Sequence, residues 1–66
     1  MSHTKKLLIV DDCIEDRRIY CRYLMQDPYQ SYEIVEANSA EDGLILCQHE
    51  KYDVILIELR LHDLNC

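Results

Sequence analysis

The sequence is poor in residues that break regular structure, with one glycine and one proline, and it contains no tryptophan or phenylalanine. Basic side chains are scarce as well: 7 lysines and arginines stand against 13 aspartates and glutamates, giving a net charge of −6. Such a surface repels phosphate backbones, so nucleic-acid binding is not expected. A membrane-spanning helix needs about 20 apolar residues, and no run here approaches that length. We therefore expect a cytoplasmic protein without membrane contacts.

The four cysteines are not spaced for metal binding. No pair has the Cys-x-x-Cys spacing, and no histidine stands at a zinc-finger distance from them. The remaining composition, 48% apolar and 30% charged, is that of a globular protein. We expect one small domain over residues 1–66, although a core of this size is marginal and usually needs help, for example from oligomerisation.

The first part of the chain predicts a strand followed by a helix. The continuous apolar run at 5–10, ended by Asp11 and Asp12, indicates a strand covered on both faces. Residues 14 to about 26 contain no glycine or proline and predict a helix, with Asp12 as its cap. The apolar arc of this helix is wider than one sheet face would cover.

The second part repeats the alternation. Residues 32–37 interleave β-branched residues with glutamates, which is typical of an edge strand. Ser39 predicts the cap of a second helix that runs to about residue 50. Its buried face is expected at Ala40, Leu44 and Cys47. The apolar run at 52–59 predicts another strand covered on both faces.

Strand, helix, strand, helix, strand is the order that gives a parallel sheet with right-handed crossovers, here with strand order 2-1-3. Asp11, Asp12 and Glu58 then fall at the carboxyl ends of neighbouring strands, where such sheets bind ligands. Three gathered carboxylates favour a hard divalent cation such as Mg²⁺. In the alternative interpretation, the two aspartates only begin a helix and Glu58 is a solvated strand end.

The runs 8–12, 35–37 and 52–58 together resemble the receiver domain of two-component response regulators, over essentially all 66 residues. The resemblance implies an α/β, flavodoxin-like fold, of which this chain would be the N-terminal half. It also implies that Asp11 and Asp12 help to hold Mg²⁺, with the backbone carbonyl of Arg60 as a further ligand. Glu58 stands where the family has the aspartate that accepts a phosphoryl group from a histidine kinase.

The departures from the family are equally specific. Glutamate places the Glu58 carboxylate about 1.5 Å farther out than aspartate, and misplacement of that size can cost on the order of 100-fold in rate. His62 and Cys66 replace the proline and glycine that commonly follow. The family's switch serine or threonine and its lysine have no counterpart here, so stable phosphorylation is not expected.

Two functions follow from this comparison. The first is a receiver-like signalling module that is not an enzyme, binds Mg²⁺ weakly, and acts through contacts with a histidine kinase or another signalling protein. The alternative is a half-domain that self-assembles and has no signalling activity. A metal-dependent phosphatase resembling haloacid-dehalogenase-type enzymes is disfavoured, because such sites need a nucleophilic aspartate two residues before an acid/base aspartate, and Asp11 and Asp12 are adjacent.

Self-association is expected for either function. The apolar run Val54, Ile55, Leu56 and Ile57 would present an unpaired strand edge. The surplus apolar surface of the first helix, at Tyr20, Tyr23 and Leu24, would add to an interface. The sequence therefore predicts a homodimer that completes the sheet.

Overall fold

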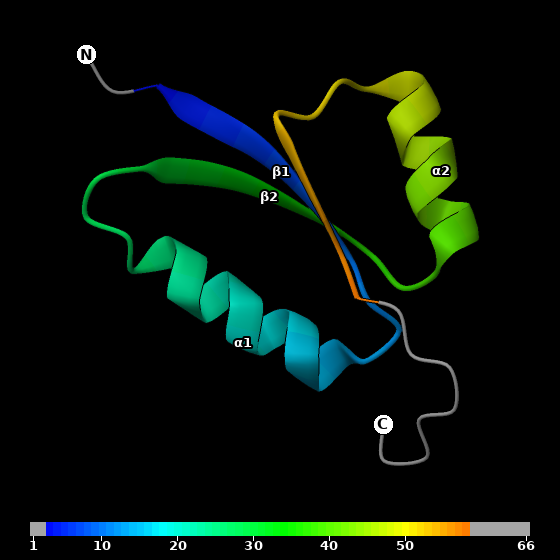
Figure 1. The fold of residues 1–66 in the computed structure, drawn as a ribbon, viewed down its shortest axis with the longest axis horizontal. Helices are drawn as coiled ribbons and strands as arrows, with labels where there is room; N and C mark the ends of the chain where they lie inside the picture. Colours follow the sequence, from blue (N-terminus) through cyan, green and yellow to red (C-terminus); the bar gives the residue numbers. More distant parts are fainter. Residues whose placement is uncertain (1–2, 59–66) are drawn as a thin grey trace.

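The computed structural model describes residues 3–58, which form a three-stranded parallel sheet with two helices (Figure 1). The strand order is β2-β1-β3, which confirms the predicted order 2-1-3. This is an α/β arrangement consistent with half of a flavodoxin-like fold. Within residues 3–58, neither helix has the length and apolar character needed to cross a membrane. The elements in chain order are β1 (Thr4–Val10), α1 (Ile14–Met25), β2 (Ser31–Ala37), α2 (Ala40–His49) and β3 (Val54–Ile57).

Strand β1 forms the centre of the core. Its second half, Leu7 to Val10, is between 0% and 6% exposed. Both edges of this strand are paired in parallel, and Leu8 has Val35 of β2 on one side and Ile55 of β3 on the other. A continuous apolar run is the pattern of a strand covered on both faces, as the sequence predicted for this segment.

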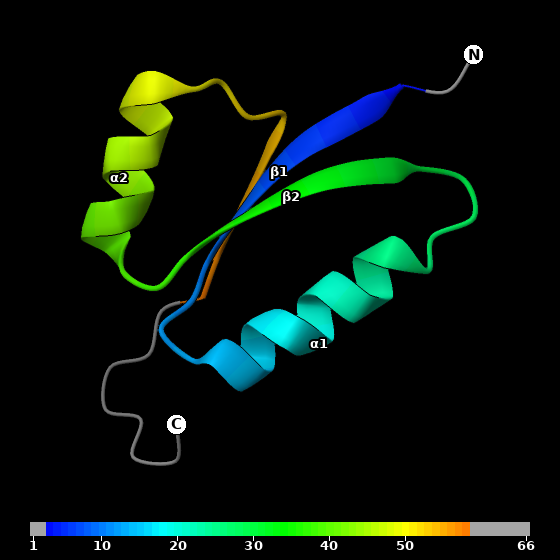
Figure 2. The same cartoon turned by 180° about the vertical axis from the view of Figure 1, so that it is seen from behind.

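The two helices lie on opposite sides of the sheet (Figures 1 and 2). Side chains alternate between the faces of a strand. Leu8 and Val10 pack in one cluster with Leu46 of α2, so they face this helix. Leu7 and Ile9 therefore point to the other face, where Arg17 of α1 reaches Glu36 of β2. This division separates the two layers that β1 holds together.

A reciprocal pair of hydrogen bonds joins β1 to the start of β3. The backbone N–H of Lys6 donates to Asp53 Oδ2 at 2.8 Å, and the N–H of Asp53 donates to the Lys6 carbonyl, also at 2.8 Å. The Lys6 ammonium group also pairs with Glu50 and lies 5.5 Å from the centre of the Tyr52 ring. At the far end of the strand, the N–H of Glu58 donates to the Val10 carbonyl at 2.9 Å.

The predicted cap of α1 is wrong. Helix α1 begins at Ile14, and its N-cap residue is Cys13, with no side-chain cap hydrogen bond. Asp12 is exposed, and Asp11 is the residue whose carboxylate accepts the Cys13 N–H, at 2.9 Å. The Ser39 cap of α2 is confirmed, because its hydroxyl oxygen accepts the N–H of Asp42 at 3.1 Å.

The predicted buried face of α2 is also wrong. Leu44 is 62% exposed, and Ala40 and Cys47 are exposed as well. The buried residue of α2 is Gly43, which lies against Val10, and half-buried Leu46 packs on the same cluster. Helix α2 approaches β1 through this glycine, so the larger side chains beside it are turned toward the outer part of the sheet.

Strand β3 is not covered on both faces, contrary to the prediction from its apolar run. It spans only Val54–Ile57, and its four residues are between 37% and 55% exposed. The reason is its position at the edge of the sheet, outside the main cover of either helix. Strand β2, at the other edge, matches the edge-strand prediction.

We expect Gly43→Ala to destabilise the fold. A Cβ at this position would lie 2.7 Å from Val10 Cγ2, and the branched valine side chain is stiff and buried. Overpacking of this kind costs about 1–3 kcal/mol, which exceeds the gain of up to about 1 kcal/mol in helix propensity.

Urea unfolding would measure this change in stability. Adding Gly43→Ala to a Val10→Ala background should cost less than adding it to the native chain, because the clashing methyl groups are gone. Equal costs in the two backgrounds would contradict the close contact.

Candidate functional site

The carboxyl ends of β1 and β3 border a cavity of about 260 Å³. Asp11, Asp12 and Glu58 all line it, as the sequence predicted from the topology. Parallel strands end at the same edge of a sheet, and this shared edge is the reason that Asp11 and Glu58, far apart in the chain, both line the cavity. The remaining lining residues come from the end of β1 and from the turn that leads into α2.

Asp11 is the most constrained residue of this cavity, at 1% exposed. Its N–H donates to the Ala37 carbonyl at 3.0 Å, and its own carbonyl accepts a hydrogen bond from the Arg17 guanidinium group. Its Oδ1 accepts the N–H of Cys13 at 2.9 Å. Oδ2 is buried and has no hydrogen-bond partner among residues 3–58. The site therefore presents one buried carboxylate oxygen with unused acceptor capacity.

Glu58 is held from the opposite face by helix α1. The Tyr20 hydroxyl donates to Glu58 Oε1 at 2.9 Å. This hydrogen bond raises the pKa of Tyr20 above its ordinary value of 10.0, with burial and the negative charges of Glu58 and Asp11 adding to the effect. Tyr20 was predicted only as part of an interface, so its role at Glu58 was missed. The signal available was a tyrosine on the sheet-facing side of the helix.

The predicted metal-ligand set is not fully assembled. Among residues 3–58, no three His, Cys, Asp or Glu side chains are grouped so as to hold a metal ion. Arg60, whose carbonyl was predicted as a ligand, lies outside the described residues. Magnesium commonly takes one or two protein carboxylates and completes its shell with water. Asp11, with exposed Asp12 beside it, is the pair that could hold such an ion.

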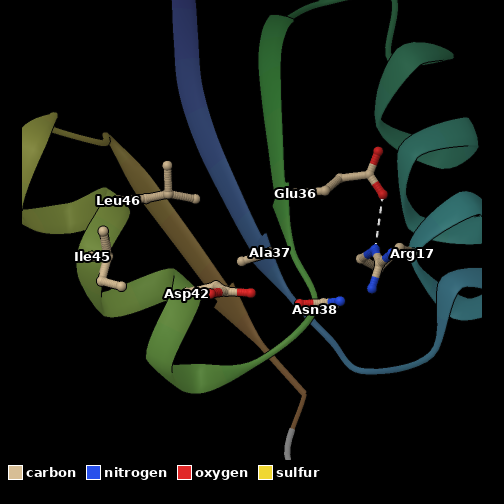
Figure 3. Close-up of a pocket in the computed structure, with 7 residues that line it drawn as sticks. All are labelled: Arg17, Glu36, Ala37, Asn38, Asp42, Ile45 and Leu46. Carbon is tan, nitrogen blue, oxygen red and sulfur yellow. Dashed lines mark hydrogen bonds and ion pairs between the residues drawn. The ribbon is translucent and has the colours of Figure 1, made fainter.

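A second and larger cavity, of about 460 Å³, lies beside this site at the end of β2 (Figure 3). Arg17 supplies positive charge to its lining, but its Nε donates to Glu36 Oε1 at 2.9 Å and its other contact is the Asp11 carbonyl. Asp42 adds negative charge on the α2 side of the cavity. An anion would compete with these partners, so the cavity is a poor anion site, and Arg17 serves to fix Asp11.

The residues predicted for a dimer interface have mixed environments. All four residues of β3 are exposed to a considerable degree. Tyr23 is 71% exposed, whereas Tyr20 and Leu24 are half-buried. The Tyr20 hydroxyl is bound to Glu58, so within residues 3–58 the strand β3 offers a larger exposed apolar surface than these helix residues do.

The contact between Tyr20 and Glu58 predicts a specific dependence of stability on pH. The folded-state pKa of Tyr20 is raised, so its contribution is fully present below pH 10.0, the ordinary value, and is lost as the pH rises through the folded pKa. Tyr20→Phe should remove this alkaline loss and cost about 0.5–1.5 kcal/mol at neutral pH.

Urea unfolding as a function of pH, together with tyrosinate absorbance, would test this expectation. Tyr23→Phe is the matched control, since Tyr23 is mostly exposed and should leave the alkaline profile unchanged. Identical profiles for the native chain and Tyr20→Phe would contradict the hydrogen bond.

Comparison with known proteins does not assign the chain to a family. No protein-family model matches it, and no curated protein gives a significant match. The functional features of the chain are those of its own geometry. The carboxyl edge of its parallel sheet carries a buried aspartate and a glutamate that accepts a hydrogen bond from Tyr20.

Proposed function

We propose that this chain is a receiver-like module of phosphorelay signal transduction that binds a divalent cation weakly and acts through protein contacts rather than catalysis. The observation that carries this proposal is the buried Oδ2 of Asp11 at the carboxyl edge of the parallel sheet, which has no hydrogen-bond partner in the described part of the chain. A histidine kinase or another signalling protein is the partner that this role implies. The resemblance of the sequence to receiver domains supports the assignment.

A bound cation is expected because it would offset the energetic cost of burying the Asp11 Oδ2 atom. A buried carboxylate without full hydrogen bonding is unfavourable, and a positive charge beside it offsets this cost. The donors at the cavity are carboxylate oxygens, which suit Mg²⁺. Asp11 would be the principal ligand and Asp12 the second, with water completing the shell. A bound ion would supply positive charge at this edge of the sheet.

The state of Glu58 argues against use of the site as a phosphoryl acceptor. The longer side chain displaces the carboxylate by about 1.5 Å relative to aspartate, and phosphoryl transfer depends on in-line positioning. Tyr20 further occupies Oε1 at 2.9 Å. Glu58 instead carries its carboxylate farther from the backbone, in the direction in which a phosphoryl group on aspartate would extend, which fits a module that is recognised in one state.

We predict that Mg²⁺ stabilises the native chain and that Asp11→Asn removes the effect. With a dissociation constant of about 1 mM, 10 mM Mg²⁺ would add about 1.4 kcal/mol to the free energy of unfolding. Asparagine keeps an oxygen for the Cys13 N–H but loses the negative charge. Without Mg²⁺, the Asp11→Asn protein should be at least as stable as the native one, because the unpartnered charge is gone.

Calorimetric titration and thermal unfolding would test the cation site. Asp27→Asn is a matched control, because Asp27 Oδ1 accepts the N–H of Tyr29 at 2.8 Å, in the same two-residue arrangement as Asp11 with Cys13. The control should keep its response to Mg²⁺. A flat titration of the native chain at millimolar Mg²⁺ would refute the site.

We also predict no stable phosphoryl adduct after treatment with a small acyl phosphate and Mg²⁺. Intact-mass measurement should show the unmodified chain, for both the native protein and Tyr20→Phe, because releasing Glu58 does not shorten it. A stoichiometric adduct mapped to Glu58 would show instead that this residue is a working acceptor.

A further inference from the structure

We propose that the open edge of β3 is an interface for a second copy of this chain, paired strand to strand about a two-fold axis into one six-stranded sheet. The inference is independent of the acidic cavity and of the proposed signalling role. It starts from the sheet order, in which β3 pairs with β1 on one side and has no strand on the other within residues 3–58.

The backbone of β3 determines which groups are free to pair. The N–H of Glu58 points to β1, where it donates to the Val10 carbonyl at 2.9 Å. Backbone polar groups alternate in direction along a strand. Those of Leu56 and Val54 therefore also point to β1, and those of Ile55 and Ile57 point outward. The free edge thus offers two donors and two acceptors.

Two-fold symmetry restricts how these groups can meet. An antiparallel pair of identical edges requires an axis perpendicular to the sheet, and this rotation keeps each face of the sheet on the same side. Residues directly opposite must then belong to the same face, so odd positions meet odd positions and even meet even. Pairing of Ile55 with Leu56 of the second copy is therefore excluded.

Among the registers that pair residues of β3 with one another, one uses all four outward groups. Ile55 lies opposite Ile57 of the second copy, and Ile57 opposite its Ile55, giving two fully hydrogen-bonded pairs with Leu56 facing its own equivalent on the axis. The register with Ile55 on the axis would set Ile57 against Asp53. This residue lies in the bend before β3, outside the regular alternation, and its N–H already donates to the Lys6 carbonyl at 2.8 Å. The first register also keeps the two Glu58 side chains apart.

The side chains fit the same arrangement. Ile55 and Ile57 line an apolar groove of about 160 Å³ together with Leu44 and Cys47 of α2. The rotation places α2 of the second copy over the same face, across the paired strands. The four isoleucines would then form a ladder between the two α2 helices, which covers the groove and the exposed face of Leu44.

A second copy would satisfy more of the exposed groups of β3 than a single helix docked in the groove would. A helix laid in the groove would cover Ile55 and Ile57 but leave their outward N–H and C=O groups unpaired. A second β3 edge satisfies the backbone, and its own α2 closes the groove.

Sedimentation of the 66-residue chain over a range of concentrations tests the interface. The expected mass is twice 7.9 kDa at high concentration, falling to one chain on dilution. Ile55→Lys should weaken dimerisation by about tenfold or more, since it places a charge in the isoleucine ladder. Tyr29→Lys adds the same charge at a residue 93% exposed before β2, near the opposite sheet edge, and should leave the mass unchanged.

Cysteine cross-linking tests the register even where a charged variant fails to fold. Leu56→Cys places a thiol opposite its equivalent in a non-hydrogen-bonded pair, where Cα atoms lie about 4.5 Å apart, within the range of a disulfide. Mild oxidation should yield covalent dimers whose digest links position 56 to itself. Ile55→Cys faces position 57 of the second copy and should give far less self-linkage.

Two outcomes would overturn the proposal. One is a monomeric mass at every concentration, which would leave the β3 edge for a strand of a different protein. The other is a dimer that Ile55→Lys and Tyr29→Lys weaken equally, or in which Ile55→Cys cross-links as readily as Leu56→Cys. This second outcome would place the contact between the two copies elsewhere on the chain.

Discussion

The parallel pairing of β1 with both of its neighbours is the interaction on which the rest of this structure depends. Within residues 3–58, β1 is the one strand with two paired edges, and its Leu7–Val10 segment supplies four of the six buried hydrophobic residues. Both helices contact β2, and α2 also contacts β1. The same pairing ends at Val10 and so positions Asp11 beside Glu58. The core and the acidic site therefore depend on one set of hydrogen bonds.

Much of the fold could be predicted because its main signals are local. Apolar runs, the Ser39 cap and the alternation of elements each depend on a few adjacent residues, and the handedness of crossovers then gives the strand order. The buried face of α2 could not be predicted in this way. Its closest approach uses Gly43, which carries no hydrophobic signal, and this contact turns Leu44 toward the edge of the sheet. Exposure of β3 likewise depends on tertiary position rather than on composition.

In the candidate site too, the sequence predicts which residues come together but not the role of each side chain. Topology alone brought Asp11, Asp12 and Glu58 to one cavity, and the structure agrees. Topology could not distinguish the two aspartates, although one is 1% exposed and the other is exposed. Nor could it identify Tyr20 as the partner of Glu58, because that contact depends on the rotation of α1 about its axis. The role of each side chain in the site depends on how the helices and strands pack, and sequence patterns do not determine that packing.

The reciprocal hydrogen-bonded pairing of Lys6 with Asp53 has a consequence for the order of folding. It joins residues 47 apart in the chain, whereas β1 meets β2 at Thr4 and Ser31. Each doubling of a loop adds about 0.6 kcal/mol of closure entropy, and β3 contributes only four residues to repay that cost. The β1–α1–β2 unit should therefore form first and β3 should dock last. In native-state hydrogen exchange, β3 would open as a separate unit while the amides between β1 and β2 stay protected.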